Sequence, residues 1–207
     1  MEVIPLMEMT LRWYGSKFDT VTLSQIRQIP GVTGVITTLY DTAPGEVWSR
    51  ERIAALKAEV AAAGLHISGI ESVNVHDAIK TGAPDRDLYI DNYIQTLENL
   101  GKEDIHLVCY NFMPVFDWTR TELARKRPDG STVLAYTQEA VDAINPEEMF
   151  ASIAGDTNGT IMPGWEPERM AHIKELFAMY EDIDDEKLFE NLKYFLEALM
   201  PTCRECD

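Results

Sequence analysis

The spacing of apolar and polar residues changes several times along this chain, and each kind of spacing indicates a helix or a strand. Short runs rich in β-branched or apolar residues, typical of buried strands, occur at Met9–Trp13, Val32–Leu39, His66–Ser72 and Ile105–Asn111. Stretches with helical spacing or high alanine content lie between them, at Leu23–Ile29, Arg50–Ala63 and Asp85–Leu100. The sequence therefore predicts alternating strands and helices as far as Asn111.

Local signals mark the ends of two of these helices. Ser49 stands where an N-cap residue is expected, and Gly64 follows the end of the same helix. Gly101 stands directly after the helix that ends at Leu100. Nearly continuous apolar strands joined by helices indicate a parallel sheet covered by helices, because parallel strands need such crossovers. The predicted fold class is therefore α/β.

The alternation breaks after Asn111. Two short polar runs flank Pro128–Ser131, which predicts a β-hairpin between Leu123 and Tyr136. Further helices are predicted at Gln138–Ile153, Glu166–Met179 and Asp184–Met200. Pro201 is expected to break the last of them, since proline lacks the backbone N–H that a helix interior requires.

These elements describe one domain over residues 7–207, with an insertion at about 118–182 and a short leader at 1–6. A closed (β/α)8 barrel needs about 250 residues. Four β/α units interrupted by a helical and hairpin insertion therefore correspond to the first half of such a barrel, and the chain is expected to be truncated or split.

Charge and composition exclude several classes of partner. The chain of 207 residues has 35 acidic and 18 basic side chains, a net charge of −17, which argues against nucleic acid or an anionic membrane. No run approaches the about 18 apolar residues that would span a bilayer. Three cysteines, an odd number without the composition of a small disulfide scaffold, indicate a reducing cytoplasm.

The fourth predicted strand ends in an unusual segment. Its apolar residues give way to amide, aromatic, carboxylate and guanidinium side chains between Asn111 and Arg120. Enzymes with parallel sheets present their substrate-contacting groups on loops at the carboxyl ends of strands. This segment is therefore interpreted as a functional loop.

Four motifs, taken in order, resemble the mannonate dehydratase family. They are Arg12-Trp13-Tyr14-Gly15, Gly45-Glu46-Val47-Trp48-Ser49, Ile70-Glu71-Ser72-Val73 with His76, and Cys109-Tyr110-Asn111-Phe112-Met113-Pro114-Val115-Phe116-Asp117-Trp118-Thr119-Arg120. The resemblance runs from about Met7 through the helix at Asp184–Met200. The last motif is long enough to be specific, whereas the first alone is weak.

The resemblance implies a TIM-like barrel of the xylose-isomerase group and a lyase of hexuronate (glucuronate) catabolism that converts D-mannonate to 2-dehydro-3-deoxy-D-gluconate. It also implies a divalent metal, manganese or iron, whose ligands lie beyond residue 207. The 207-residue chain alone is then expected to be inactive. Its expected partners are a sugar acid and either further copies of itself or a complementing C-terminal half.

Three predicted substrate-binding residues lie at or near strand ends. Arg12 could hold a carboxylate with its planar fork, or could instead pack over Trp13 or pair with an acid. Tyr14 could bind a sugar hydroxyl or simply cover the barrel mouth. Glu71 follows apolar neighbours and needs a partner, which could be substrate, a metal-bound water or Arg12.

Two more candidates complete the predicted binding site. His76 lies in the loop after the third strand and could bind substrate or move a proton, although an isolated loop histidine is often incidental. Asn111 ends the fourth strand, where its amide could bond to a polyol. Cys109, in the same strand, is expected to pack as a small hydrophobic residue. The residue that removes the proton stays unidentified.

Two other functions are compatible with the same residues. Strand-end glutamate and histidine would equally suit a sugar isomerase or epimerase of the same barrel group. A half barrel without activity of its own is the other alternative, because the outer edges of its first and fourth strands would be unpaired and open to association.

Overall fold

The computed structural model describes residues 7–115, 120–142 and 173–206. The chain forms two compact units, one made of Met1–Phe112 with Asp182–Asp207 and the other of Met113–Glu181. The parts of the predicted helices Gln138–Ile153 and Glu166–Met179 that fall within 143–172 lie outside the described residues, as do Asp117 and Trp118 of the fourth motif.

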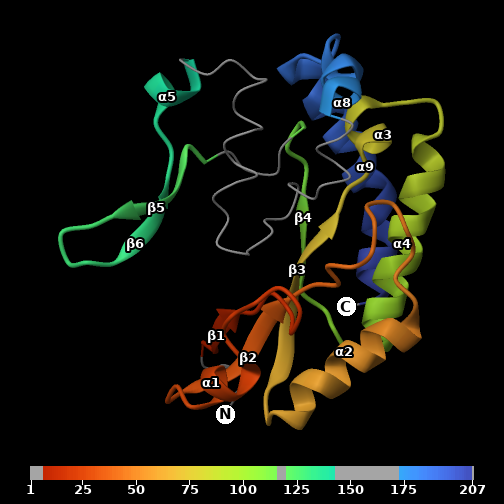
Figure 1. Cartoon of the computed structure of the whole chain (residues 1–207). Helices are drawn as coiled ribbons and strands as arrows, with labels where there is room; N and C mark the ends of the chain where they lie inside the picture. Colours follow the sequence, from red (N-terminus) through yellow and green to blue (C-terminus); the bar gives the residue numbers. More distant parts are fainter. Residues whose placement is uncertain (1–6, 116–119, 143–172, 207) are drawn as a thin grey trace. The chain divides into compact units, whose positions relative to one another are not determined.

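The first unit is built on a four-stranded parallel sheet whose strand order follows the chain (Figure 1). The strands are β1 (Met9–Arg12), β2 (Val32–Thr37), β3 (His66–Asn74) and β4 (Val108–Asn111). This confirms the predicted α/β class and the four predicted strands. Within the described part of the chain, no strand pairs with the outer edge of β1 or of β4.

Helices connect the strands and cover the sheet. They are α1 (Leu23–Arg27), α2 (Arg50–Ala62), α4 (Arg86–Lys102) and α9 (Asp185–Glu205), of which α2, α4 and α9 lie on one side of the sheet in Figure 1. The core between these layers is apolar and includes fully buried side chains: Val35, Ile53, Val60, Ile70, Leu100 and Phe195. Ser49 caps α2 as predicted, since its hydroxyl accepts from the Arg52 N–H at 3.4 Å.

The Gly45–Ser49 motif is held in place by α4. The side-chain amides of Asn92 and Asn99 donate to the carbonyls of Gly45 (2.9 Å) and Trp48 (2.8 Å), and the Trp48 N–H donates to the Thr96 hydroxyl at 3.1 Å. Thr96 and Trp48 are buried. These bonds satisfy polar groups that would otherwise be buried without partners, so this motif stabilises the fold.

Two predicted helix ends are wrong. Helix α4 continues through Gly101 to Lys102, because Asp104, with φ of 61°, makes the left-handed turn instead. A Cβ on Gly101 would lie 2.9 Å from the Cβ of Cys206, so this glycine allows α9 to approach α4 closely. Helix α9 likewise continues through Pro201, because the buried Thr202 and the part-buried Cys203 pack its last turn against the core.

The description of β4 as a buried strand is also wrong. Ile105 is buried but precedes the strand, while Cys109 and Tyr110 within it are exposed. Cys109 therefore does not pack as a core residue. The physical reason is that, among the strands of the described residues, β4 lies at the edge of the sheet, so it has a neighbouring strand on one flank only.

The second unit contains the predicted hairpin. Strands β5 (Glu122–Lys126) and β6 (Thr132–Ala135) pair antiparallel, and Asp129 closes the turn by accepting from the Ser131 N–H at 3.0 Å. Two helices, α5 (Gln138–Asp142) and α8 (Ile173–Tyr180), also belong to it. No helix within the described residues is long and apolar enough to cross a bilayer.

Gly45→Ala tests how tightly the Gly45–Ser49 segment is packed. Gly45 has φ of +87°, and an added Cβ would lie 2.6 Å from the Tyr89 ring. Left-handed backbone alone costs a non-glycine residue about 1–2 kcal/mol, so the ring contact should add to that loss. The free energy of unfolding measures it, with Gly31→Ala as the control, since Gly31 has φ of +85° and no atom within 4 Å. Equal losses in the two variants would contradict the packing.

Tyr93→Phe tests the buried phenol of α4. Burial raises the pKa of Tyr93, whose hydroxyl donates to the Val73 carbonyl at 3.3 Å. Below about pH 10, the ordinary tyrosine pKa, the buried neutral hydroxyl makes its full contribution to the stability of the fold. At higher pH this contribution is lost, because Tyr93 releases its proton more readily in the unfolded chain than in the folded one. The urea midpoint of unfolding, measured at several pH values from about 9 upward, should therefore fall less steeply with pH in Tyr93→Phe than in the parent. Equal slopes of the midpoint against pH in the two proteins would contradict this expectation.

Candidate active site

The carboxyl ends of β1, β2 and β3 bring three polar side chains together. Arg12 ends β1, Tyr40 follows β2, and Glu71 lies in β3. The Nη2 of Arg12 donates to the Tyr40 hydroxyl at 2.8 Å, and its Nη1 lies 2.8 Å from Oε2 of Glu71. The second contact is an ion pair without the alignment of a directed hydrogen bond, since Nη1 has no hydrogen-bond partner within the described residues.

Aromatic rings surround the Arg12 guanidinium. Its central carbon lies 5.0 Å from the centroid of the Tyr14 ring and 6.0 Å from that of Tyr40. The centroids of the two tyrosine rings lie 5.8 Å apart, and the centroid of the Phe18 ring lies 5.5 Å from that of Tyr40. Cation–π attraction together with the bond to Tyr40 therefore fixes the orientation of the arginine.

The charges of the residues around Arg12 leave its guanidinium able to bind a further anion. Burial raises the pKa of Tyr40 to about 12 although the Arg12 charge opposes the shift, so the phenol is neutral at physiological pH. Glu71 is the only anion paired with Arg12 within the described residues, and its side chain is 58% exposed. The Nε of Arg12 is buried and has no hydrogen-bond partner among them. The guanidinium thus retains unused donors.

Asn111 belongs to a different network. It is buried, its side-chain oxygen accepts from the Val75 N–H at 3.2 Å, and its amide nitrogen donates to Asn74 at 3.0 Å and to Ser72 at 3.4 Å. The structure therefore brings Arg12, Tyr14 and Glu71 together, whereas Asn111 joins β3 to β4.

His76 caps a short helix that the sequence pattern did not predict, α3 (Asp77–Thr81). Its Nδ1 accepts from the Ala78 N–H at 3.1 Å, and its ring stacks on Tyr89 at 3.6 Å. An accepting Nδ1 places the proton of the neutral ring on Nε2. These contacts place His76 at the N-terminus of α3, with its ring packed on Tyr89.

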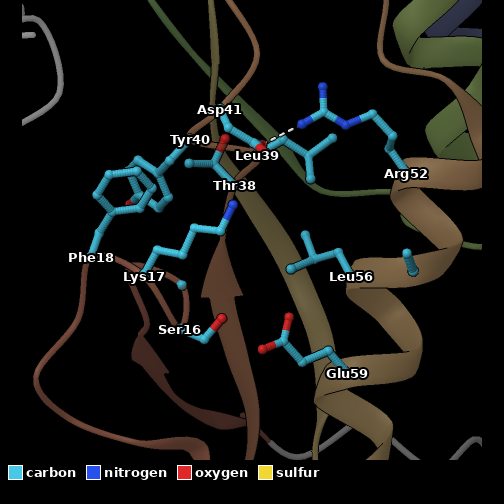
Figure 2. A pocket seen from close by; sticks show the side chains of 12 residues that line it. Ser16, Lys17, Phe18, Thr38, Leu39, Tyr40, Asp41, Arg52, Leu56 and Glu59 are labelled. Carbon is cyan, nitrogen blue, oxygen red and sulfur yellow. Dashed lines mark hydrogen bonds and ion pairs between the residues drawn. The ribbon is translucent and has the colours of Figure 1, made fainter.

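A cavity of about 270 Å³ adjoins the arginine cluster. Its walls are Gly15–Phe18, Thr38–Asp41 and the part of α2 that contains Arg52 and Glu59. Figure 2 shows Lys17 and Glu59 reaching toward it from opposite sides, and Arg52 paired with Asp41. Tyr40 borders the cavity and also bonds to Arg12, which is not itself among the residues that line the cavity.

Sequence reasoning missed Tyr40. Thr38-Leu39-Tyr40-Asp41 follows β2 just as the residues after Asn111 follow β4, so the same signal of polar and aromatic residues after a strand was available. Within residues 7–115, 120–142 and 173–206, no group of three or more histidine, cysteine, aspartate or glutamate side chains could hold a metal ion.

Comparisons with known proteins identify the family. Residues 7–207 match the profile of the D-mannonate dehydratase (UxuA) family. The chain is 65% identical over 199 residues to the mannonate dehydratase of Brachyspira hyodysenteriae and 53% identical over 200 residues to that of Geobacillus thermodenitrificans. These matches cover 96% and 97% of this chain but 56% and 54% of those proteins.

A solved structure agrees with the sequence matches. The crystal structure of mannonate dehydratase from Streptococcus suis serotype 2 superimposes with a TM-score of 0.79 at 42% identity, covering 97% of this chain and 51% of that one. The chain thus spans about half the length of the relatives it matches. The matched profile and the shared fold confirm the resemblance carried by the motifs: the chain belongs to the D-mannonate dehydratase (UxuA) family.

Proposed function

We propose that this chain is part of an enzyme that removes water from D-mannonate to give 2-dehydro-3-deoxy-D-gluconate, and that its sheet is one half of a (β/α)8 barrel. The names of the relatives and the family profile support the reaction. Sequential parallel strands with helices between them support the barrel, since this is the repeating unit of that fold.

The arginine cluster is the observation that carries the proposed binding role. A sugar acid presents a carboxylate, which a guanidinium recognises with two parallel hydrogen bonds. Arg12 is held by Tyr40 and Tyr14, and its donors are not all used. We therefore assign the substrate carboxylate to Arg12, with Tyr40 as a positioning residue. Glu71 and the Tyr14 hydroxyl are then placed to accept from or donate to the sugar hydroxyls.

The reaction itself requires groups that this chain does not supply among its described residues. Dehydration breaks the C–H bond next to the carboxylate and the C–O bond at the following carbon. The C–H electron pair becomes the new double bond, the hydroxyl leaves with the C–O pair and is protonated to water, a base takes the proton, and the resulting enol tautomerises to the 2-oxo acid. A divalent metal, manganese or iron, would stabilise the negative charge that develops on the carboxylate. The described residues do not form a site for it, so we propose that its ligands come from the portion of the relatives' length that this chain does not span.

The 207-residue chain alone should not dehydrate D-mannonate. Mixed or co-expressed with the part of the Brachyspira hyodysenteriae protein that lies outside the match, and supplied with Mn²⁺ or Fe²⁺, it should form the 2-oxo acid product. Chemical detection of the 2-oxo acid measures this. Dehydration by the chain alone would refute the proposal that the metal ligands lie outside it, and isomerisation of an aldose by the mixture without dehydration would refute the proposed reaction.

Arg12→Lys tests the binding role in that reconstituted enzyme. Lysine keeps the positive charge but lacks the planar guanidinium that binds a carboxylate with two hydrogen bonds, and it loses the bond to Tyr40. KM for D-mannonate should therefore rise roughly tenfold or more, with a smaller change in kcat. Tyr40→Phe should raise KM less, because the ring remains. Arg50→Lys is the control, since Arg50 begins α2 and pairs at 2.7 Å with Glu103, the C-cap residue of α4, away from the arginine cluster. A change in kcat alone for Arg12→Lys would contradict the assignment.

A further inference from the structure

Tyr40 lies in a loop that the sheet does not hold directly. Strand β2 ends at Thr37, which pairs with Ile70, so Tyr40 lies beyond the last pair of that ladder. The cavity of about 270 Å³ lies between this loop and α2, so packing alone does not fix the loop on that side. Other contacts must therefore keep the Tyr40 hydroxyl bonded to Arg12.

Side chains anchor this loop at both of its ends. At one end, the Thr38 hydroxyl donates to the Ser72 carbonyl of β3 at 2.7 Å. At the other end, Nη1 of Arg52 donates to the Thr42 hydroxyl at 2.7 Å. Nη2 of the same guanidinium pairs with Asp41, as Figure 2 shows. The loop is therefore tied to β3 before the tyrosine and to α2 after it.

The two contacts of Arg52 differ in strength. The side chains of Arg52 and Asp41 are 39% and 54% exposed, and exposed ion pairs contribute little to stability. Thr42 is buried, so its bond to a charged donor is shielded from water and is the stronger of the two. A planar guanidinium serves both acceptors at once, which a lysine ammonium on a flexible stem does less well. The bond to Thr42 is thus the main restraint that α2 places on the loop.

We propose that Arg52 is a positioning residue for the substrate carboxylate. By holding Thr42 and Asp41 it keeps the Tyr40 hydroxyl bonded to Arg12, and so keeps the Arg12 guanidinium in the orientation that recognises a carboxylate. The inference rests on the proposed function and deepens it, because it names a residue of α2, outside the arginine cluster, that sets the affinity of that cluster for the sugar acid.

The first test measures steady-state kinetics of the reconstituted enzyme. Arg52→Gln should raise KM for D-mannonate roughly threefold or more with a smaller change in kcat, because it loosens a group that binds the substrate carboxylate. In a Tyr40→Phe background the same change should add little to KM, because the hydroxyl through which Arg52 acts is absent. An unchanged KM, or effects of the two changes that multiply independently in the double variant, would overturn the inference.

Matched variants locate the contact. Thr42→Val removes the acceptor and should raise KM, whereas Thr42→Ser keeps the hydroxyl and should raise it less. Arg50→Gln removes a positive charge from the same helix, where Arg50 pairs with Glu103 at 2.7 Å, and should leave KM unchanged. Circular dichroism verifies that each variant folds, and Thr42→Val decides the test if Arg52→Gln does not fold. Equal effects of Thr42→Val and Thr42→Ser would contradict the role of the hydroxyl.

The second test uses the 207-residue chain without substrate or metal. Burial raises the pKa of Tyr40 to about 12, and a loop released by Arg52→Gln should expose the phenol and return its pKa toward about 10. Loss of the arginine charge by itself would shift the pKa upward, so the direction of the change separates the two effects. NMR of isotope-labelled tyrosine side chains, with Tyr40→Phe to assign the signal, follows the titration. A Tyr40 pKa that is unchanged or higher in Arg52→Gln would disprove the positioning.

The two tests separate this inference from the proposed function. A reconstituted enzyme that forms no 2-oxo acid would refute the proposed reaction, while the titration would still show whether Arg52 holds Tyr40. An enzyme that forms the product with the same KM in the parent and in Arg52→Gln would refute the positioning role alone.

Discussion

The parallel register of β1, β2 and β3 is the constraint on which the candidate site depends. Arg12 lies beside Ile36, and the neighbouring Thr37 pairs with Ile70, so Glu71 lies two strands away from Arg12. Adjacent strands are about 4.8 Å apart, which separates β1 from β3 by about twice that distance. A long arginine side chain can cross β2 and meet a glutamate, and a shift of one residue in either ladder would point one of them to the opposite face.

This crossing explains why the arginine needs Tyr40. A long side chain loses considerable conformational entropy when it is held in one rotamer, and an exposed ion pair compensates for little of that loss. Glu71 is more than half exposed, so its pair with Arg12 is a weak restraint. Tyr40 adds a hydrogen bond from a part-buried position and, with Tyr14, an aromatic surface. The tyrosines therefore contribute more than Glu71 to the fixed geometry of the guanidinium.

The sequence predicted the sheet because buried strands leave a local signature. It predicted Arg12 and Glu71 because both lie toward the carboxyl ends of predicted strands, although β3 continues past Glu71 to Asn74. Their ion pair was among the alternatives considered for them. It could not predict that Asn111 bonds inward to Val75, since an amide at a strand end is compatible with either a substrate or a neighbouring backbone. Pro201 and Cys109 were misinterpreted for a related reason. Long-range packing keeps Pro201 within a helix, and the absence of an outer neighbour among the described strands leaves Cys109 exposed.

Two charged pairs cross β2, at different levels of the sheet. Besides Arg12 and Glu71, a second pair crosses β2 nearer the start of the strands, where Glu8 meets His66 at 2.7 Å and accepts from Thr33 at 2.8 Å. A Cβ on Gly34 would lie 2.7 Å from the Glu8 carboxylate, so the glycine makes room for this crossing. Charged pairs thus cross β2 near both ends of the strands, and each can form only in the observed register of the three strands.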